Sequence, residues 1–107
     1  MTTLDAACQI LVSGEVQGVG YRYWTRGMAA GLGVTGWARN LADGRVEIHA
    51  EGDPAALEAL VEACRKGPRS AVVTAVVRSP RRPRGATRFE IRRDGAAPEP
   101  AEDPTAP

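Results

Sequence analysis

The sequence predicts an α+β protein with two helices on one face of an antiparallel sheet, in the element order β-α-β-β-α-β. Short apolar runs with strand-like spacing alternate with two segments whose apolar residues recur at helical intervals. Each helical segment has a single apolar stripe, so the two helices need a common surface to cover. A chain of 107 residues is long enough for one such domain and too short for two.

Residues 8–13 (CQILVS) predict the first strand, because alternate residues share one apolar face. The glycine-rich segment 14–20 predicts a structured loop. Helical spacing then begins and continues to Leu32, and Gly33 can end this helix in a left-handed conformation. The apolar residues with helical spacing are Tyr21, Trp24, Met28 and Leu32.

Residues 34–41 and 45–50 predict two further strands. They are joined by a turn at Asp43-Gly44, a pair typical of hairpins because the turn needs positive φ. In the second of these strands, apolar residues alternate with polar ones.

The second helix has the clearest pattern. Asp53 can cap it, and Pro54 suits its first position because no N–H is needed there. Its apolar stripe consists of Leu57, Leu60, Val61 and Cys64. Gly67-Pro68 ends the helix. A valine-rich strand over 71–78, a basic loop over 79–86 and a last strand over 87–92 follow.

This order is that of the ferredoxin-like split βαβ sandwich, a fold that hosts many functions. We expect the domain to span residues 1–93. Residues 94–107 hold four acidic residues, no basic residue, and prolines among alanines, so we expect a disordered tail there.

The composition argues against several classes of protein. The chain has 14 basic and 13 acidic residues, which argues against a protein that holds nucleic acid or a membrane by bulk charge. No apolar run approaches the roughly 20 residues of a membrane span, and no signal peptide is evident. Two cysteines are too few for a disulfide scaffold, and reduced buried thiols are expected for Cys8 and Cys64. We therefore expect a cytoplasmic protein.

The segment 14–22 (GEVQGVGYR) has the features of an anion-binding loop. A glycine-rich loop that enters a helix presents several backbone N–H groups to one point, where the helix terminus adds partial positive charge. The guanidinium of Arg22, in the first helical turn, matches two oxygens of a phosphate. Taken alone, this pattern fits equally a tight turn with a surface arginine. The loop lacks the lysine of a Walker A motif and the spacing of a dinucleotide-binding loop.

The same segment resembles the signature G-x-V-Q-G-V-x-[FY]-R of the acylphosphatase family. The resemblance continues through residues 33–40 (GVTGWARN) and 43–47 (DGRVE) and covers about residues 8–92. It implies the ferredoxin-like fold and a hydrolase that splits small-molecule acyl phosphates into carboxylate and inorganic phosphate without a cofactor.

The resemblance also implies roles for individual residues. Arg22 matches the catalytic arginine that binds the phosphoryl group, and Asn40 matches the asparagine that positions the attacking water. The loop whose backbone amides bind the phosphoryl group corresponds to Val16, Gln17, Gly18, Val19, Gly20 and Tyr21. Glu15 departs from the pattern, and we expect it to point into solvent.

The residues suggest no other reaction centre. No cluster of His, Cys and carboxylate side chains has metal-ligand spacing, so we expect no bound metal. Nothing in the sequence requires more than a monomer. One alternative is a non-catalytic or partner-dependent anion-binding module of the same family. Another is an RNA-binding module, but residues 45–50 lack the aromatic side chains on which bases would stack.

Overall fold

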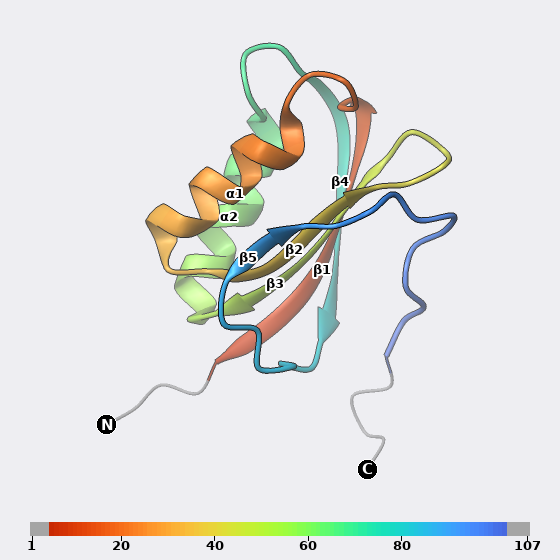
Figure 1. The fold of residues 1–107 in the computed structure, drawn as a ribbon. Coiled ribbons are helices and arrows are strands. Elements are labelled where there is room, and N and C mark those ends of the chain that lie inside the picture. The colour runs from red at the N-terminus through yellow and green to blue at the C-terminus, as the bar shows by residue number, and fades with distance from the viewer. Residues whose placement is uncertain (1–4, 103–107) are drawn as a thin grey trace.

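The computed structural model describes residues 5–102 and confirms the predicted order of elements (Figure 1). Both helices lie on one face of a five-stranded sheet with the strand order β4-β1-β3-β2-β5. The elements are β1 (Ala6–Glu15), α1 (Tyr21–Leu32), β2 (Thr35–Asn40), β3 (Val46–Gly52), α2 (Pro54–Lys66), β4 (Val72–Arg81) and β5 (Phe89–Ile91).

The sheet is mixed, which corrects the expectation of a fully antiparallel one. The first four strands pair antiparallel, but β5 pairs parallel with β2, from Gly36–Phe89 to Ala38–Ile91. The reason lies in the connection from β4. Strand β4 finishes where β1 begins, since Arg81 is opposite Ala7. Strand β2 begins at this same end, so a chain that crosses to it directly must run in its direction.

The core lies between the helices and the sheet. On β3 the apolar residues alternate with polar ones as predicted and belong to this core, and the whole predicted stripe of α2 is buried. Helix α1 differs in detail, because Tyr21, Thr25 and Ala29 are its fully buried residues, whereas the other residues of the predicted stripe are half-buried beside them. Thr25 tolerates burial because its hydroxyl donates to the carbonyl of Tyr21 at 2.8 Å.

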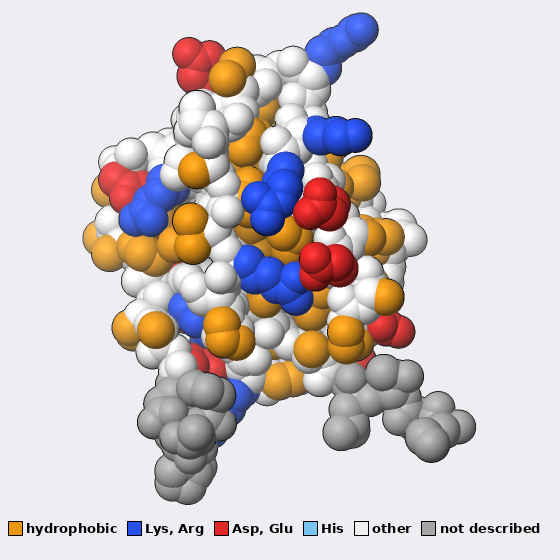
Figure 2. Space-filling view, turned by 180° about the vertical axis from the view of Figure 1, so that it is seen from behind, with side chains coloured by type: hydrophobic (Ala, Val, Ile, Leu, Met, Phe, Trp, Pro, Cys, Tyr) orange, Lys and Arg blue, Asp and Glu red, His pale blue; other side chains and the backbone are white. Residues whose placement is uncertain are grey.

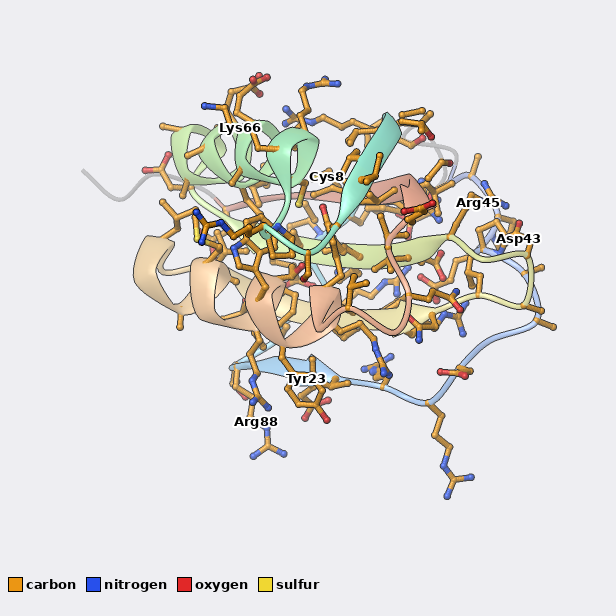
Figure 3. All side chains as sticks on the ribbon, turned by 90° about the horizontal axis from the view of Figure 1, so that it is seen from above. Cys8, Tyr23, Asp43, Arg45, Lys66 and Arg88 are labelled. Carbon is orange, nitrogen blue, oxygen red and sulfur yellow. The ribbon has the colours of Figure 1, made fainter. Side chains whose placement is uncertain are left out.

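The predicted helix ends and hairpin are confirmed. The carboxylate of Asp53 accepts from the backbone N–H of Ala55 at 2.9 Å, and Gly33 ends α1 with φ 72°. At the tip of the β2–β3 hairpin, the side chains of Asp43 and Arg45 lie side by side, with Arg45 Nη2 2.7 Å from Asp43 Oδ2 (Figure 3).

Around the central strand β3, the face of the sheet away from the helices is also buried. It carries polar side chains, with Gln9, Glu47, His49 and Glu51 all at most 5% exposed. These side chains bond partly to one another, and backbone groups add further partners: residues 84–86 donate to Glu51, and residue 99 bonds to Gln9 and Glu47. We call this surface the polar face.

The C-terminal segment makes specific contacts in its described part. Gly95 forms a bridge with Leu41, the N–H of Glu99 donates to Glu47, and Arg84 pairs with the carboxylates of Glu99 and Glu102. Composition alone predicted disorder from residue 94 and did not indicate these contacts, because their partners lie far away in sequence. Residues 103–107 of the expected tail lie outside the described part of the chain.

Strand β4 extends three residues beyond its predicted end, so the first part of the expected basic loop is a strand. Pro80 fits there because β4 is an edge strand, where a missing N–H costs no ladder bond. Within residues 5–102, no helix is long and apolar enough to cross a membrane.

Candidate active site

The candidate site lies at the end of the sheet where β1 and β2 both finish. The loop 16–20 follows β1, and Asn40 is the last residue of β2. The side chain of Gln17 joins the two regions, because its Nε2 donates to the carbonyls of Leu41 at 2.8 Å and Arg45 at 2.9 Å. The loop is therefore fixed directly against the β2–β3 hairpin.

Two glycines shape the entry into α1. Gly18 and Gly20 have φ of 73° and 79°, in the left-handed region that favours glycine. Gly20 is the N-cap residue of α1, and no side chain caps this end of the helix within the described chain. The first-turn amides of α1 therefore remain available to an anion.

The loop is anchored from three directions. Val16 is buried in the core, and the hydroxyl of Tyr21 donates to the carbonyl of Cys64 at 2.7 Å. The hydroxyl of Ser70, in the connection after α2, donates to the carbonyl of Val19 at 2.8 Å. The sequence did not indicate Ser70, because nothing in the local pattern links it to a residue 51 positions earlier.

Arg22 lies in the first turn of α1 with 27% of its side chain exposed. Its Nη1 is 3.8 Å from Oδ1 of Asp94, and this is its one ion pair among the described residues. A guanidinium has five N–H donors, so most of them remain available to a bound oxyanion.

Asn40 presents an unused acceptor. Its Oδ1 is buried and has no hydrogen-bond partner within residues 5–102, whereas its backbone carbonyl accepts from the N–H of Gly95 at 2.9 Å. Buried polar atoms in proteins are nearly always hydrogen-bonded, so an unpartnered amide oxygen at a strand end is suited to accept a hydrogen bond from a bound water.

The structure thus brings the predicted site residues to one end of the sheet. The adjacent residues Asp94 and Gly95 connect Arg22 with Asn40, since the first contacts Arg22 and the second bonds to Asn40. Glu15 is exposed, as expected.

Neither the two cysteines nor Tyr21 supplies a nucleophile. Cys8 and Cys64 are buried free thiols, and burial raises the pKa of Cys64 to about 11. Burial also raises the pKa of Tyr21 above its ordinary value. These groups stay protonated near neutral pH. No three metal-binding side chains gather among the residues that the structure describes.

Comparison with known proteins decides the family. The family model described as Acylphosphatase matches residues 8–91. The chain belongs to the acylphosphatase family. The acylphosphatase of Marinobacter nauticus is 61% identical to it over 67 residues, which are 63% of this chain and 73% of that protein.

Solved structures agree with this assignment to the acylphosphatase family. The crystal structure of acylphosphatase from Bacillus subtilis is 41% identical with a TM-score of 0.78, and the match covers 80% of this chain and 97% of that one. The structure of HypF from T. kodakarensis is 30% identical with a TM-score of 0.73, and the match covers 87% of this chain but 12% of HypF. The family resemblance found in the sequence is confirmed.

Proposed function

We propose that this acylphosphatase-family protein hydrolyses the carboxyl–phosphate bond of acyl phosphates by direct attack of water. The amides of residues 16–21 and the guanidinium of Arg22 hold the phosphoryl group, and Asn40 positions the water. The observation that carries this proposal is the unpartnered Oδ1 of Asn40, at the strand end to which Gln17 ties the loop.

The proposed reaction is balanced without a cofactor. The water oxygen forms a bond to phosphorus while the bond from phosphorus to the acyl oxygen breaks, and the carboxylate leaves with the electron pair. Both protons of the water remain on the inorganic phosphate. A carboxylate is a weakly basic leaving group, so the site needs no strong acid. Its task is to position the water and stabilise charge on the phosphoryl oxygens.

A neutral amide suits the water-binding position. The Oδ1 of Asn40 can accept a hydrogen bond from the water without repelling the phosphoryl dianion, whereas a carboxylate there would repel it. Arg22 suits its own position because its planar fork contacts two oxygens at once, which a lysine cannot do.

Binding of RNA is disfavoured by the same structure. Every residue of β3 is buried, so this strand offers no platform for bases. On the face seen in Figure 2, basic and acidic side chains lie next to each other among the described residues and do not gather into one basic patch. We also propose a monomer in the cytoplasm, because one chain supplies all the proposed site residues and both thiols are free.

The test is hydrolysis of benzoyl phosphate in the presence of EDTA. We expect turnover by the wild type, and a loss of about 3–4 kcal/mol of transition-state stabilisation in Arg22→Ala, with Arg22→Lys little better. Arg26→Ala is the matched control, since Arg26 lies one turn further along α1 over the Tyr23 ring. It should retain wild-type turnover.

The other outcomes are equally informative. Near-normal turnover in Arg22→Ala would refute the assigned roles. A folded wild type that binds phosphate but hydrolyses nothing, with or without added partners, would favour the anion-binding module instead.

A further inference from the structure

One charged residue of the site matches no part of the family signature. The carboxylate of Asp94 lies 3.8 Å from the guanidinium that we assign to the phosphoryl group. We infer that Asp94 is a resident anion of the phosphate site, which competes with phosphate for Arg22 and weakens its binding. This inference rests on the proposed function.

The backbone beside Asp94 is held in place. The N–H of Gly95 donates to the carbonyl of Asn40 at 2.9 Å, and the N–H of Ala42 donates to the carbonyl of Gly95 at 3.0 Å. Gly95 is thereby bonded to the end of β2, next to the side chain that we assign to the water. Asp94 consequently stays at the site whether or not its side chain contacts Arg22.

The side chain itself is free to move. It is 72% exposed, and its ion pair with Arg22 is its one polar contact among the described residues. An exposed pair at this separation is weak and easily displaced. A phosphoryl dianion gains the loop amides in addition to Arg22, so it can displace the carboxylate. The displaced carboxylate still remains a few ångströms from the dianion and repels it.

The consequence is weaker binding of both substrate and product at the phosphoryl end. Removing the negative charge of Asp94 should tighten the binding of inorganic phosphate about fivefold at low ionic strength, as expected for a unit charge near a solvated anion. The gain should shrink as salt screens the two charges.

The experiment compares Asp94→Asn with Asp5→Asn. Both changes remove one negative charge, but Asp5 precedes the ten-residue strand β1 whereas the phosphate loop follows it, so about 33 Å separates Asp5 from the site. Calorimetric titration with inorganic phosphate at low and high salt gives the dissociation constants. We expect Asp94→Asn to bind phosphate about fivefold more tightly than Asp5→Asn at low salt, with a smaller ratio at high salt.

Each other result decides the matter. Equal affinities of the two variants would overturn the inference. Weaker binding by Asp94→Asn would overturn it as well, because the carboxylate would then orient Arg22 instead of competing with the ligand. Phosphate binding is measured without turnover. If the wild type were inactive but Asp94→Asn still bound phosphate more tightly, the role inferred for Asp94 would be upheld and the catalytic proposal refuted. Absence of phosphate binding in wild type and Asp94→Asn alike would refute both.

Discussion

The proposed active-site end of the sheet differs from the buried carboxylates of the polar face in how its polar groups are partnered, although Nδ1 of His49 on the polar face is also buried without a partner among the described residues. On the polar face, Glu47 accepts from Gln9 at 2.6 Å, from Arg39 at 2.7 Å and from the N–H of Glu99 at 2.7 Å. At the site, Oδ1 of Asn40 has no partner among the described residues, and Arg22 has one loose ion pair. Satisfied polar groups stabilise a fold, whereas unsatisfied ones cost stability and remain available to a ligand.

Glu51 is a second buried carboxylate of the polar face that has several hydrogen-bond partners. Its carboxylate accepts from the N–H groups of residues 84, 85 and 86 and lies 2.7 Å from Nε2 of His49. Burial acts to raise the pKa of Glu51, but the contact with His49 and the backbone hydrogen bonds outweigh it and hold the pKa below its ordinary value. The polar face thus attaches the segment after β4 to the sheet.

The largest effect should come from the polar face. Glu47→Ala leaves three donors without their buried acceptor, so we expect a loss of about 3–5 kcal/mol in the free energy of unfolding. Urea denaturation of the variant and the wild type measures this loss. Glu62→Ala is the control, since Glu62 is 65% exposed in a helical pair with Arg65 and should change stability by less than about 1 kcal/mol. Equal losses in the two variants would contradict the contrast.

Asn40→Ala should show the reverse pattern. Turnover of benzoyl phosphate should fall by about 2–4 kcal/mol in transition-state stabilisation. The free energy of unfolding should stay within about 1 kcal/mol of wild type, because the removed oxygen has no partner to lose. A large loss of stability with unchanged turnover per folded molecule would assign Asn40 to the fold.

Acid should weaken the polar face through Glu51. Its pKa is lowered in the folded state, so its stabilising contribution is fully present above the ordinary value of 4.5. That contribution is lost as the pH falls below 4.5 and through the lowered pKa. Glu51→Gln should lose about 1.5–3 kcal/mol at neutral pH and show a shallower fall in acid. Urea denaturation between pH 7 and pH 3 tests this, and parallel curves for the two proteins would exclude Glu51 as a cause.

The smallest effect should come from the anchor of the phosphate loop. Ser70→Ala removes the hydroxyl that donates to Val19, so the loop should be less well ordered. We expect a loss of about 1 kcal/mol in kcat/KM for benzoyl phosphate, with unfolding nearly unchanged. Ser70→Thr keeps a hydroxyl and should restore activity. Failure of threonine to rescue an impaired alanine variant would argue against this hydrogen bond as the cause.

Local patterns were enough to predict the helices, the hairpin and the glycine-rich loop before α1. The cap at Asp53, the stop at Gly33 and the glycines of the loop act through neighbours within a few residues, so the sequence alone indicated them. The motif also pointed to Arg22 and Asn40, through its resemblance to a known family.

Only the tertiary structure decided which residues that are far apart in sequence come into contact. Alternation in β3 predicted that Glu47 and His49 share one face, but it did not predict what would cover that face. In the structure, segments that follow β4 cover it. The direction of β5, the link from Ser70 to Val19 and the contact of Asp94 with Arg22 have the same origin. Each depends on the path that a connection takes between elements, and residue periodicity carries no information about that path.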